Sequence, residues 1–172
     1  TLQFLGWLTP PTDPRRAVMP NTVRVGPSHL ITASRRKSVE HFGDRPPLSR
    51  NWIEAFESRD EARTWHSLGE IAETDRGRFN GNPPSLVHVG GSRLAAIYGF
   101  RGVPYGIRAR ISDDLGKHWG REILLRDDVV DFDSGYVRSA LRSDGKIVSI
   151  YYLKTHKRIE LHFEATLWDP DS

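Results

Sequence analysis

The chain has 172 residues, a formal net charge of +3, 37% hydrophobic residues and no cysteine. The lack of cysteine excludes disulfides, thiolate metal sites and thiol catalysis. No apolar run approaches the roughly 20 residues of a membrane span, and the basic residues are scattered among acidic ones. We therefore expect neither a membrane nor a nucleic-acid partner.

Apolar and polar residues alternate with a period of two in short runs, and turn residues separate these runs. This pattern predicts strands along the whole chain. No stretch of 12 or more residues shows a helical period, so the predicted fold class is all-β. The expected strands fall near 19–26, 29–36, 51–58, 65–73, 83–89, 93–100, 105–112, 119–126, 136–142, 146–152 and 158–168.

The strands recur in a repeat. Residues 93–99 align with 146–152 and, more loosely, with 29–35. The first unit is 10 residues longer, and a longer loop within 36–50, around Pro46–Pro47, accounts for the difference. A repeat of about 50 residues with several short strands in each unit is typical of β-propeller blades.

Two octets, at 58–65 and 112–119, follow the pattern Ser-x-Asp-x-Gly-x-x-Trp, with Ala62 in place of the first glycine. In such an octet the aspartate can accept hydrogen bonds from backbone N–H groups, and the glycine permits a positive φ. The tryptophan begins the next strand. We expect both octets to be structural hairpin turns, with their tryptophans buried at equivalent places. The residues assigned to these turns are Ser58, Asp60, Trp65, Ser112, Asp114, Gly116 and Trp119.

The octets are similar to the Asp-box (BNR) turns of the sialidase superfamily. The segments 81–86, 98–101, 104–110 and 133–139 strengthen this resemblance to exo-α-sialidase-like β-propellers, which covers residues 15–170. The resemblance implies a six-bladed propeller built from four-stranded antiparallel sheets. This chain would form about three of the blades.

We interpret the chain as a single domain, 1–172, that is part of a longer propeller. Its blades are expected at 15–74, 80–127 and 131–170, and the apolar segment 1–8 is expected to be a strand that completes a terminal blade. Three blades cannot close a ring, because propellers carry about four to eight. Exposed blade edges would favour self-association.

The face opposite the box turns is predicted to carry the chemistry, because it collects Arg, Tyr and Asp side chains. Guanidinium groups bind carboxylates through paired hydrogen bonds, so this face suits an acidic sugar of a glycan. The resemblance implies a tyrosine nucleophile, an aspartate acid/base and arginines that clamp the sugar carboxylate. The catalytic candidates are Tyr136 and Asp133, and the substrate-binding candidates are Arg36, Arg101, Arg108, Arg138, Tyr105 and Asn82.

Two functions are left open. One is an exo-α-sialidase-type glycoside hydrolase, with Glu54 or Glu160 as the partner of the tyrosine. The other is a non-catalytic propeller module that binds glycans or another protein. No cofactor is expected. No metal site is expected either, because the seven histidines lack ligand spacing, and Asp131 and Asp133 are not followed by the other ligands of a calcium loop. A secreted or periplasmic location fits if a signal segment lies upstream.

Overall fold

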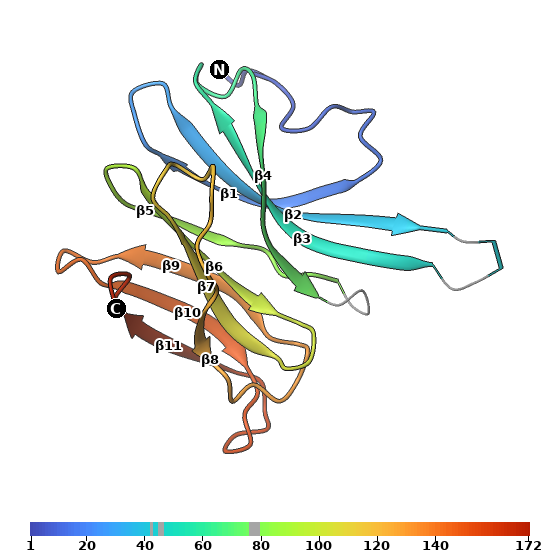
Figure 1. Cartoon of the computed structure of the whole chain (residues 1–172), viewed down its shortest axis with the longest axis vertical. Coiled ribbons are helices and arrows are strands. Elements are labelled where there is room, and N and C mark those ends of the chain that lie inside the picture. The colour runs from blue at the N-terminus through green and yellow to red at the C-terminus, as the bar shows by residue number, and fades with distance from the viewer. Residues whose placement is uncertain (42, 45–46, 76–79) are drawn as a thin grey trace.

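The computed structural model describes residues 1–41, 43–44, 47–75 and 80–172, which form three antiparallel sheets. The sheets are stacked in chain order, with the first and third at opposite ends of the stack (Figure 1). Within the described ranges, no helix is long and apolar enough to cross a membrane.

Each sheet is a meander in which consecutive strands pair. The first sheet has the strand order β1-β2-β3-β4, the second β5-β6-β7-β8 and the third β11-β10-β9. These sheets confirm the prediction of an all-β fold made of propeller blades. The strands are β1 (Arg16–Arg24), β2 (Leu30–Glu40), β3 (Leu48–Ser58), β4 (His66–Asp75), β5 (Ser85–Gly90), β6 (Arg93–Phe100), β7 (Gly106–Ser112), β8 (Ile123–Arg126), β9 (Gly135–Leu141), β10 (Ile147–Leu153) and β11 (His162–Trp168).

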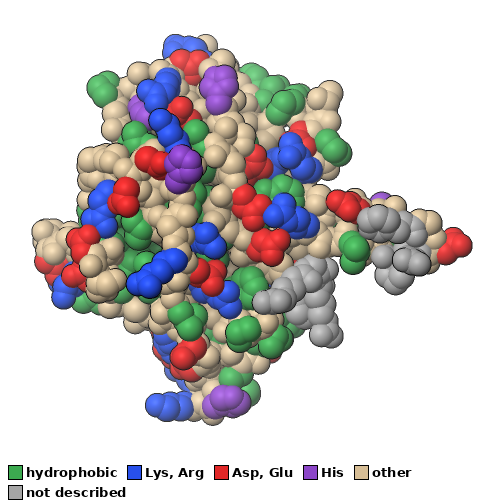
Figure 2. Space-filling model, in the orientation of Figure 1, with side chains coloured by type: hydrophobic (Ala, Val, Ile, Leu, Met, Phe, Trp, Pro, Cys, Tyr) green, Lys and Arg blue, Asp and Glu red, His purple; other side chains and the backbone are tan. Residues whose placement is uncertain are grey.

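The longer first unit extends a hairpin rather than adding a loop. Strands β2 and β3 stay paired out to Glu40 and Leu48, and this hairpin projects from the body of the molecule (Figures 1 and 2). Pro46 lies outside the described residues, as do residues 76–79 of the turn-rich stretch between β4 and β5.

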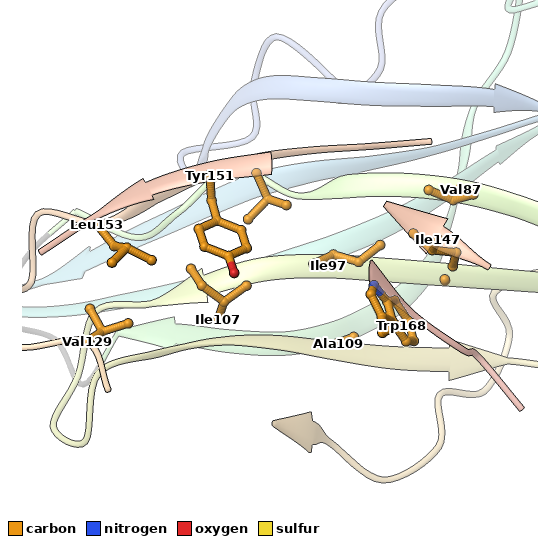
Figure 3. Packing of buried hydrophobic residues seen from close by; sticks show 11 residues of the cluster. Val87, Ile97, Ile107, Ala109, Val129, Ile147, Tyr151, Leu153 and Trp168 are labelled. Carbon is orange, nitrogen blue, oxygen red and sulfur yellow. The ribbon is translucent and has the colours of Figure 1, made fainter. Parts of the chain in front are cut away.

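Strand β6 contributes to two apolar cores because its side chains alternate between the two faces of the second sheet. Leu94, Ala96 and Tyr98 pack with the first sheet, whereas Ala95 and Ile97 pack with the third. The second sheet is therefore covered on both faces. The core between the second and third sheets also contains Val87, Ile107, Ala109, Val129, Val137, Ile147, Tyr151, Leu153 and Trp168 (Figure 3).

Residues 1–15, here named the N-terminal strap, have an irregular backbone and lie along the far face of the first sheet (Figure 1). The strand expected at 1–8 is therefore absent. Near one end of the strap, Gly6 lies so close to the first box turn that an added Cβ would be 2.3 Å from the Arg63 carbonyl oxygen. Near the other end, the Asp13 carboxylate contacts Nη2 of the fully buried Arg36 at 2.6 Å.

Both octets form the turn between the third and fourth strands of their sheets. In the second octet, the Ser112 hydroxyl donates to Asp114 at 2.9 Å and accepts the Gly116 N–H at 2.8 Å. The Asp114 carboxylate also accepts the backbone N–H of His118 at 2.8 Å. These bonds satisfy the backbone donors of the tight turn, which explains the spacing of serine, aspartate and glycine.

The first octet repeats this arrangement without the glycine. The Ala62 N–H donates to Ser58 Oγ at 2.9 Å, and the Thr64 N–H donates to Asp60 at 2.9 Å. Ala62 has a φ of 67°, in the left-handed region that favours glycine. The hydrogen bonds of the turn therefore hold an alanine in a strained conformation.

The two tryptophans are half-buried, so the prediction that they are buried was wrong. Trp119 packs at the edge of the core between the first and second sheets, and its Nε1 donates to the Gly116 carbonyl at 3.1 Å. Trp65 lies beside the strap residues Phe4 and Leu5. Each ring thus packs on the element that precedes its own sheet in the chain, which is the strap for Trp65 and the first sheet for Trp119. The outer side of each ring is exposed at the end of the turn.

Candidate active site

A group of polar side chains gathers at the end of the sheets opposite the box turns. Strand β6 ends immediately before Arg101, the loop into β9 carries Asp133, and β10 presents Tyr152 close to its end. Tyr136 lies at the start of β9 and Arg35 comes from β2. These five residues are here named the central cluster. The structure thus brings together three of the sequence-predicted residues, Arg101, Asp133 and Tyr136.

Arg101 holds the cluster together from a buried position. Its side chain is 8% exposed, and its guanidinium donates to the carbonyl oxygens of Ser134 and Asn80. Nη2 also donates to the Tyr152 hydroxyl at 3.0 Å. The guanidinium lies 5.5 Å from the centre of the Tyr136 ring, within range of a cation–π contact.

Asp133 is the accessible carboxylate of the cluster. Its side chain is 48% exposed, and Oδ1 accepts a hydrogen bond of 2.8 Å from the Tyr152 hydroxyl. Burial, followed by the bond to Asp133, raises the pKa of Tyr152 to about 12. Tyr152 is therefore a neutral donor at physiological pH, and it fixes one carboxylate oxygen while the other can face a ligand.

Tyr136 has an unusual backbone that turns its side chain toward the cluster. Its φ is 48°, and its N–H donates to Oδ1 of Asn82 at 2.9 Å. The Nδ2 group of Asn82 donates to the Ser134 carbonyl at 2.7 Å. Asn82 is fully buried and both ends of its amide are used in these bonds. It therefore positions the start of β9. Direct binding of substrate by Asn82 stays a prediction.

Arg35 is a member of the cluster that the sequence did not single out. Its Nη1 donates to the Gly81 carbonyl at 2.9 Å. Burial lowers the pKa of Arg35, and the neighbouring Tyr136 hydroxyl offsets part of this effect. Tyr136 is thus flanked by two guanidinium groups, those of Arg35 and Arg101.

The charge of the cluster is not balanced by close ion pairs. Arg36, Arg50 and Arg93 each lie 2.6 Å from a carboxylate oxygen elsewhere in the molecule. Among the residues described, the carboxylate nearest to Arg101 is Asp133 at 3.9 Å, and Arg35 forms no ion pair with any of them. An anionic ligand group at this end of the sheets would meet unneutralised guanidinium charge.

Four other predicted substrate-binding residues lie elsewhere. Arg36 is buried under the strap between Asp13 and Glu54, at 2.6 and 2.9 Å. Arg108 pairs with Glu122 at 2.7 Å, in a polar groove between the first and second sheets. Arg138 is exposed along β9 and donates to its neighbouring backbone carbonyl. Tyr105 packs against the core between the second and third sheets. The sequence predicts these residues on one face. In the structure their different ion-pair, hydrogen-bond and packing partners hold them in separate places.

The suggested glutamate partners of the tyrosine are also remote from it. Glu54 is bound by Arg36 and accepts a hydrogen bond of 2.6 Å from Ser67 on the first sheet. Glu160 is exposed in the loop between β10 and β11. Across the described part of the chain, no group of three or more His, Asp or Glu side chains is arranged to hold a metal ion.

No known family model matches the chain, and no curated protein sequence matches it either. Solved structures are similar in fold. A protein of unknown function from Dyadobacter fermentans has a TM-score of 0.64 at 20% sequence identity. A family 117 glycoside hydrolase from Zobellia galactanivorans has a TM-score of 0.56 at 13% identity, and an alpha-L-arabinanase from Penicillium chrysogenum has 0.55 at 14%.

These alignments cover 90%, 92% and 91% of this chain, in the same order. They cover 38%, 54% and 64% of the respective solved chains, so this chain spans less than two thirds of each. At such low identity the likeness establishes the fold, which is that of consecutive β-propeller blades.

Proposed function

We propose that this chain contributes the active site of a propeller glycosidase that acts on an acidic glycan. The observation that carries the proposal is the exposed carboxylate of Asp133, held by the Tyr152 hydroxyl beside the guanidinium of Arg101. Two of the proteins with a similar fold are a family 117 glycoside hydrolase and an alpha-L-arabinanase complexed with arabinobiose. These two proteins support a sugar as the substrate class.

In the proposed reaction, Asp133 in its acid form donates a proton to the glycosidic oxygen. Tyr136 Oη attacks the anomeric carbon and releases its own proton to solvent, so that the glycosidic bond breaks and the aglycone leaves as an alcohol. Water then attacks the anomeric carbon. Asp133 accepts a proton from that water, and the tyrosine oxygen leaves and is reprotonated.

The sugar is proposed to be acidic, as in an exo-α-sialidase-type reaction. Arg35 and Arg101 lie beside Tyr136, and neither has a carboxylate within 3.5 Å among the described residues. A sugar carboxylate would satisfy this charge through charge-assisted hydrogen bonds. A tyrosine nucleophile suits such a substrate, because a neutral hydroxyl does not repel an anionic sugar.

Hydrolysis of fluorogenic glycosides by the longest natural form of the protein tests the proposal. We expect cleavage of an α-sialoside or a glucuronide and little cleavage of an arabinofuranoside. Tyr136→Phe should abolish turnover while calorimetric binding of the acidic sugar persists. Tyr105→Phe is the matched control, because Tyr105 lies against the core. Absence of any acidic-glycoside cleavage, or full turnover in Tyr136→Phe, would overturn the proposal.

A non-catalytic glycan-binding module is the second candidate. It is favoured because Tyr136 Oη makes no hydrogen bond to any described glutamate or aspartate, which leaves the tyrosine without a base. This reading expects the sugar to bind with no turnover in the wild-type protein. Self-association through the outer edge of β11 also stays a proposal, since the third sheet ends at this strand.

A further inference from the structure

The face of β2 that packs toward the second sheet changes from apolar to basic along the strand. Alternation places on this one face the side chains of Ile31, Ala33, Arg35 and Lys37. Ile31 and Ala33 fill the core between the first and second sheets. Arg35 and Lys37 continue past that core toward the end of the sheets that carries the central cluster, and Val39 follows them with an exposure of 46%. The strand therefore presents two cations in succession beside the candidate active site.

Arg16 adds a third cation to this face. It begins β1 and is paired directly with Lys37 in the register of β1 and β2. Side chains of directly opposed residues lie on the same face of a sheet, so Arg16 and Lys37 project together. Arg16 is exposed and Lys37 is half-buried. These two residues, together with Arg35 and Arg101 of the central cluster, are here named the basic band.

The loop before β5 holds the band against the cluster. Arg35 Nη1 donates to the Gly81 carbonyl at 2.9 Å, and Lys37 Nζ donates to Oδ1 of Asn80 at 2.9 Å. The Arg101 guanidinium donates to the Asn80 carbonyl at 3.2 Å. Three cations from two sheets therefore meet on one short loop. Arg35 and Lys37 are two residues apart, which along a strand is about 7 Å.

The charge of the band is not neutralised by carboxylates of the chain. Among the described residues, three members of the band form no ion pair, and Arg101 has only the Asp133 carboxylate, at 3.9 Å. Asp75 lies across β3 from Lys37, but its buried carboxylate is held by the amide of Asn51 at 3.0 Å. The band therefore offers several positive charges to a ligand.

The members of the band also repel one another. Burial lowers the pKa of Arg35, and the positive charges of Arg101 and Arg16 lower it further. Neighbouring like charges cost stability, and an anion that spans them relieves this cost at each cation that it meets. A ligand with a single anionic group relieves it only in the part of the band beside Tyr136.

On the basis of the function proposed above, we propose that the basic band binds a glycan that carries an anionic group on more than one sugar. The sugar at Tyr136 places its acidic group between Arg35 and Arg101. The next acidic sugar lies on Lys37 and Arg16, toward the projecting β2–β3 hairpin (Figure 1). Carboxylates and sulfates share the chemistry that guanidinium and ammonium groups recognise.

Calorimetric binding of matched monomers and linear trimers to the natural chain tests the band. Sialic acid and galacturonic acid supply carboxylates, sulfated galactose supplies sulfates, and unmodified galactose is the neutral series. We expect the trimer of at least one acidic series to bind at least about tenfold tighter than its monomer, because each added anion gains charged hydrogen bonds. Added salt should reduce this gain, since exposed charges are screened. The series that shows the gain identifies the anionic group. No gain in any acidic series, or an equal gain in the neutral series, would overturn the proposal.

Substitutions locate the gain on the band. Arg16→Gln and Lys37→Gln should each lower the ratio of trimer to monomer affinity about threefold, and the double variant should bring the ratio close to one. Lys117→Gln is the matched control, because Lys117 is an exposed lysine on the second box turn, at the opposite end of the sheets. An equal drop for Lys117→Gln, or an unchanged ratio in the double variant, would refute the band. A DNA oligonucleotide that binds the band as tightly as the acidic trimer would refute a glycan as its ligand.

These binding measurements do not depend on turnover. Cleavage of a single acidic sugar with no affinity gain for its trimer would keep the proposed glycosidase and refute the band. Tight binding of the trimer that depends on Arg16 and Lys37, without cleavage of any acidic glycoside, would keep the band and refute the glycosidase.

Discussion

The Tyr152 hydroxyl donates a 2.8 Å hydrogen bond to Oδ1 of Asp133, although one residue lies on β10 and the other in the loop before β9. Arg101 donates to the same hydroxyl at 3.0 Å. The buried guanidinium of Arg101 therefore orients the Tyr152 hydroxyl, and this hydroxyl in turn orients the exposed carboxylate of Asp133. This relay fixes the carboxylate without neutralising it, because Asp133 stays 3.9 Å from the arginine itself.

Replacing Tyr152 with phenylalanine tests this relay. The substitution removes the donor to Asp133 but keeps the ring that lies 5.7 Å from Tyr136. A hydrogen bond to a charged group contributes about 1.5–3 kcal/mol, so kcat for an acidic glycoside should fall about 10- to 100-fold. KM should change little, because Arg35 and Tyr136 are untouched. An equal rise in KM with unchanged kcat would assign Tyr152 to substrate binding instead.

Arg35 should decide the preference for acidic sugars. Arg35→Gln keeps a donor for the Gly81 carbonyl but removes the charge beside Tyr136. We expect the affinity for a carboxylate-bearing sugar to fall at least tenfold, while the affinity for its uncharged methyl ester stays the same. Calorimetry with both ligands measures the difference. Arg50→Gln is the control, because Arg50 is paired with Glu70 and Glu73 on the first sheet. Equal losses for both ligands would refute a carboxylate site.

The strands and the box turns could be predicted because their signals are local. Period-2 alternation fixes which residues form strands, and the serine–aspartate spacing fixes the turn. The cluster depends on contacts between distant segments. Arg35 and Arg36 are neighbours on β2 and point to opposite faces, so the choice between them depends on what covers each face. The strap covers Arg36, and an irregular strap has no periodic signal in the sequence.

Tyr152 shows the same limit at the third sheet. Tyr151 and Tyr152 are adjacent in the sequence, and alternation along the strand places their side chains on opposite faces of the sheet. Tyr151 is the one buried in the core. The sequence alone does not show which of the two side chains faces the core. The sequence predicts Arg108 in the site because it lies on the face opposite the box turns. In the structure the Arg108 guanidinium pairs instead with Glu122, which lies just before β8, so Arg108 lies outside the cluster.

The strained alanine of the first box turn offers a test of turn energetics. A left-handed φ costs an L-residue about 1–2 kcal/mol, whereas glycine loses about 0.5–1 kcal/mol more backbone entropy on folding. Ala62→Gly should therefore stabilise the chain by about 0.5–1 kcal/mol. Gly116→Ala should do the reverse, because its φ is 88° and its added Cβ would meet only ordinary contacts at 3.5 Å or more. Urea denaturation measures both. Destabilisation by Ala62→Gly would mean that the turn carries no backbone strain.

The box carboxylates should also shape stability in acid. Bonds to the hydroxyl and backbone N–H of Thr64 lower the pKa of Asp60 to about 2, and bonds to the backbone N–H and ring of His118 lower that of Asp114 to about 2. A carboxyl whose pKa is lower in the folded chain than in the unfolded chain stabilises the fold above the unfolded value of 3.8. That contribution is lost as the pH falls through the folded value.

Asp114→Asn should therefore be less stable than the wild type at pH 7, with the two stability curves converging between about pH 4 and 2. Thermal unfolding across this range measures the convergence. Asp113→Asn, whose carboxylate contacts the Arg93 side chain, controls for the change in net charge. Parallel curves for Asp114→Asn and the wild type would show that the turn does not depend on an ionised aspartate.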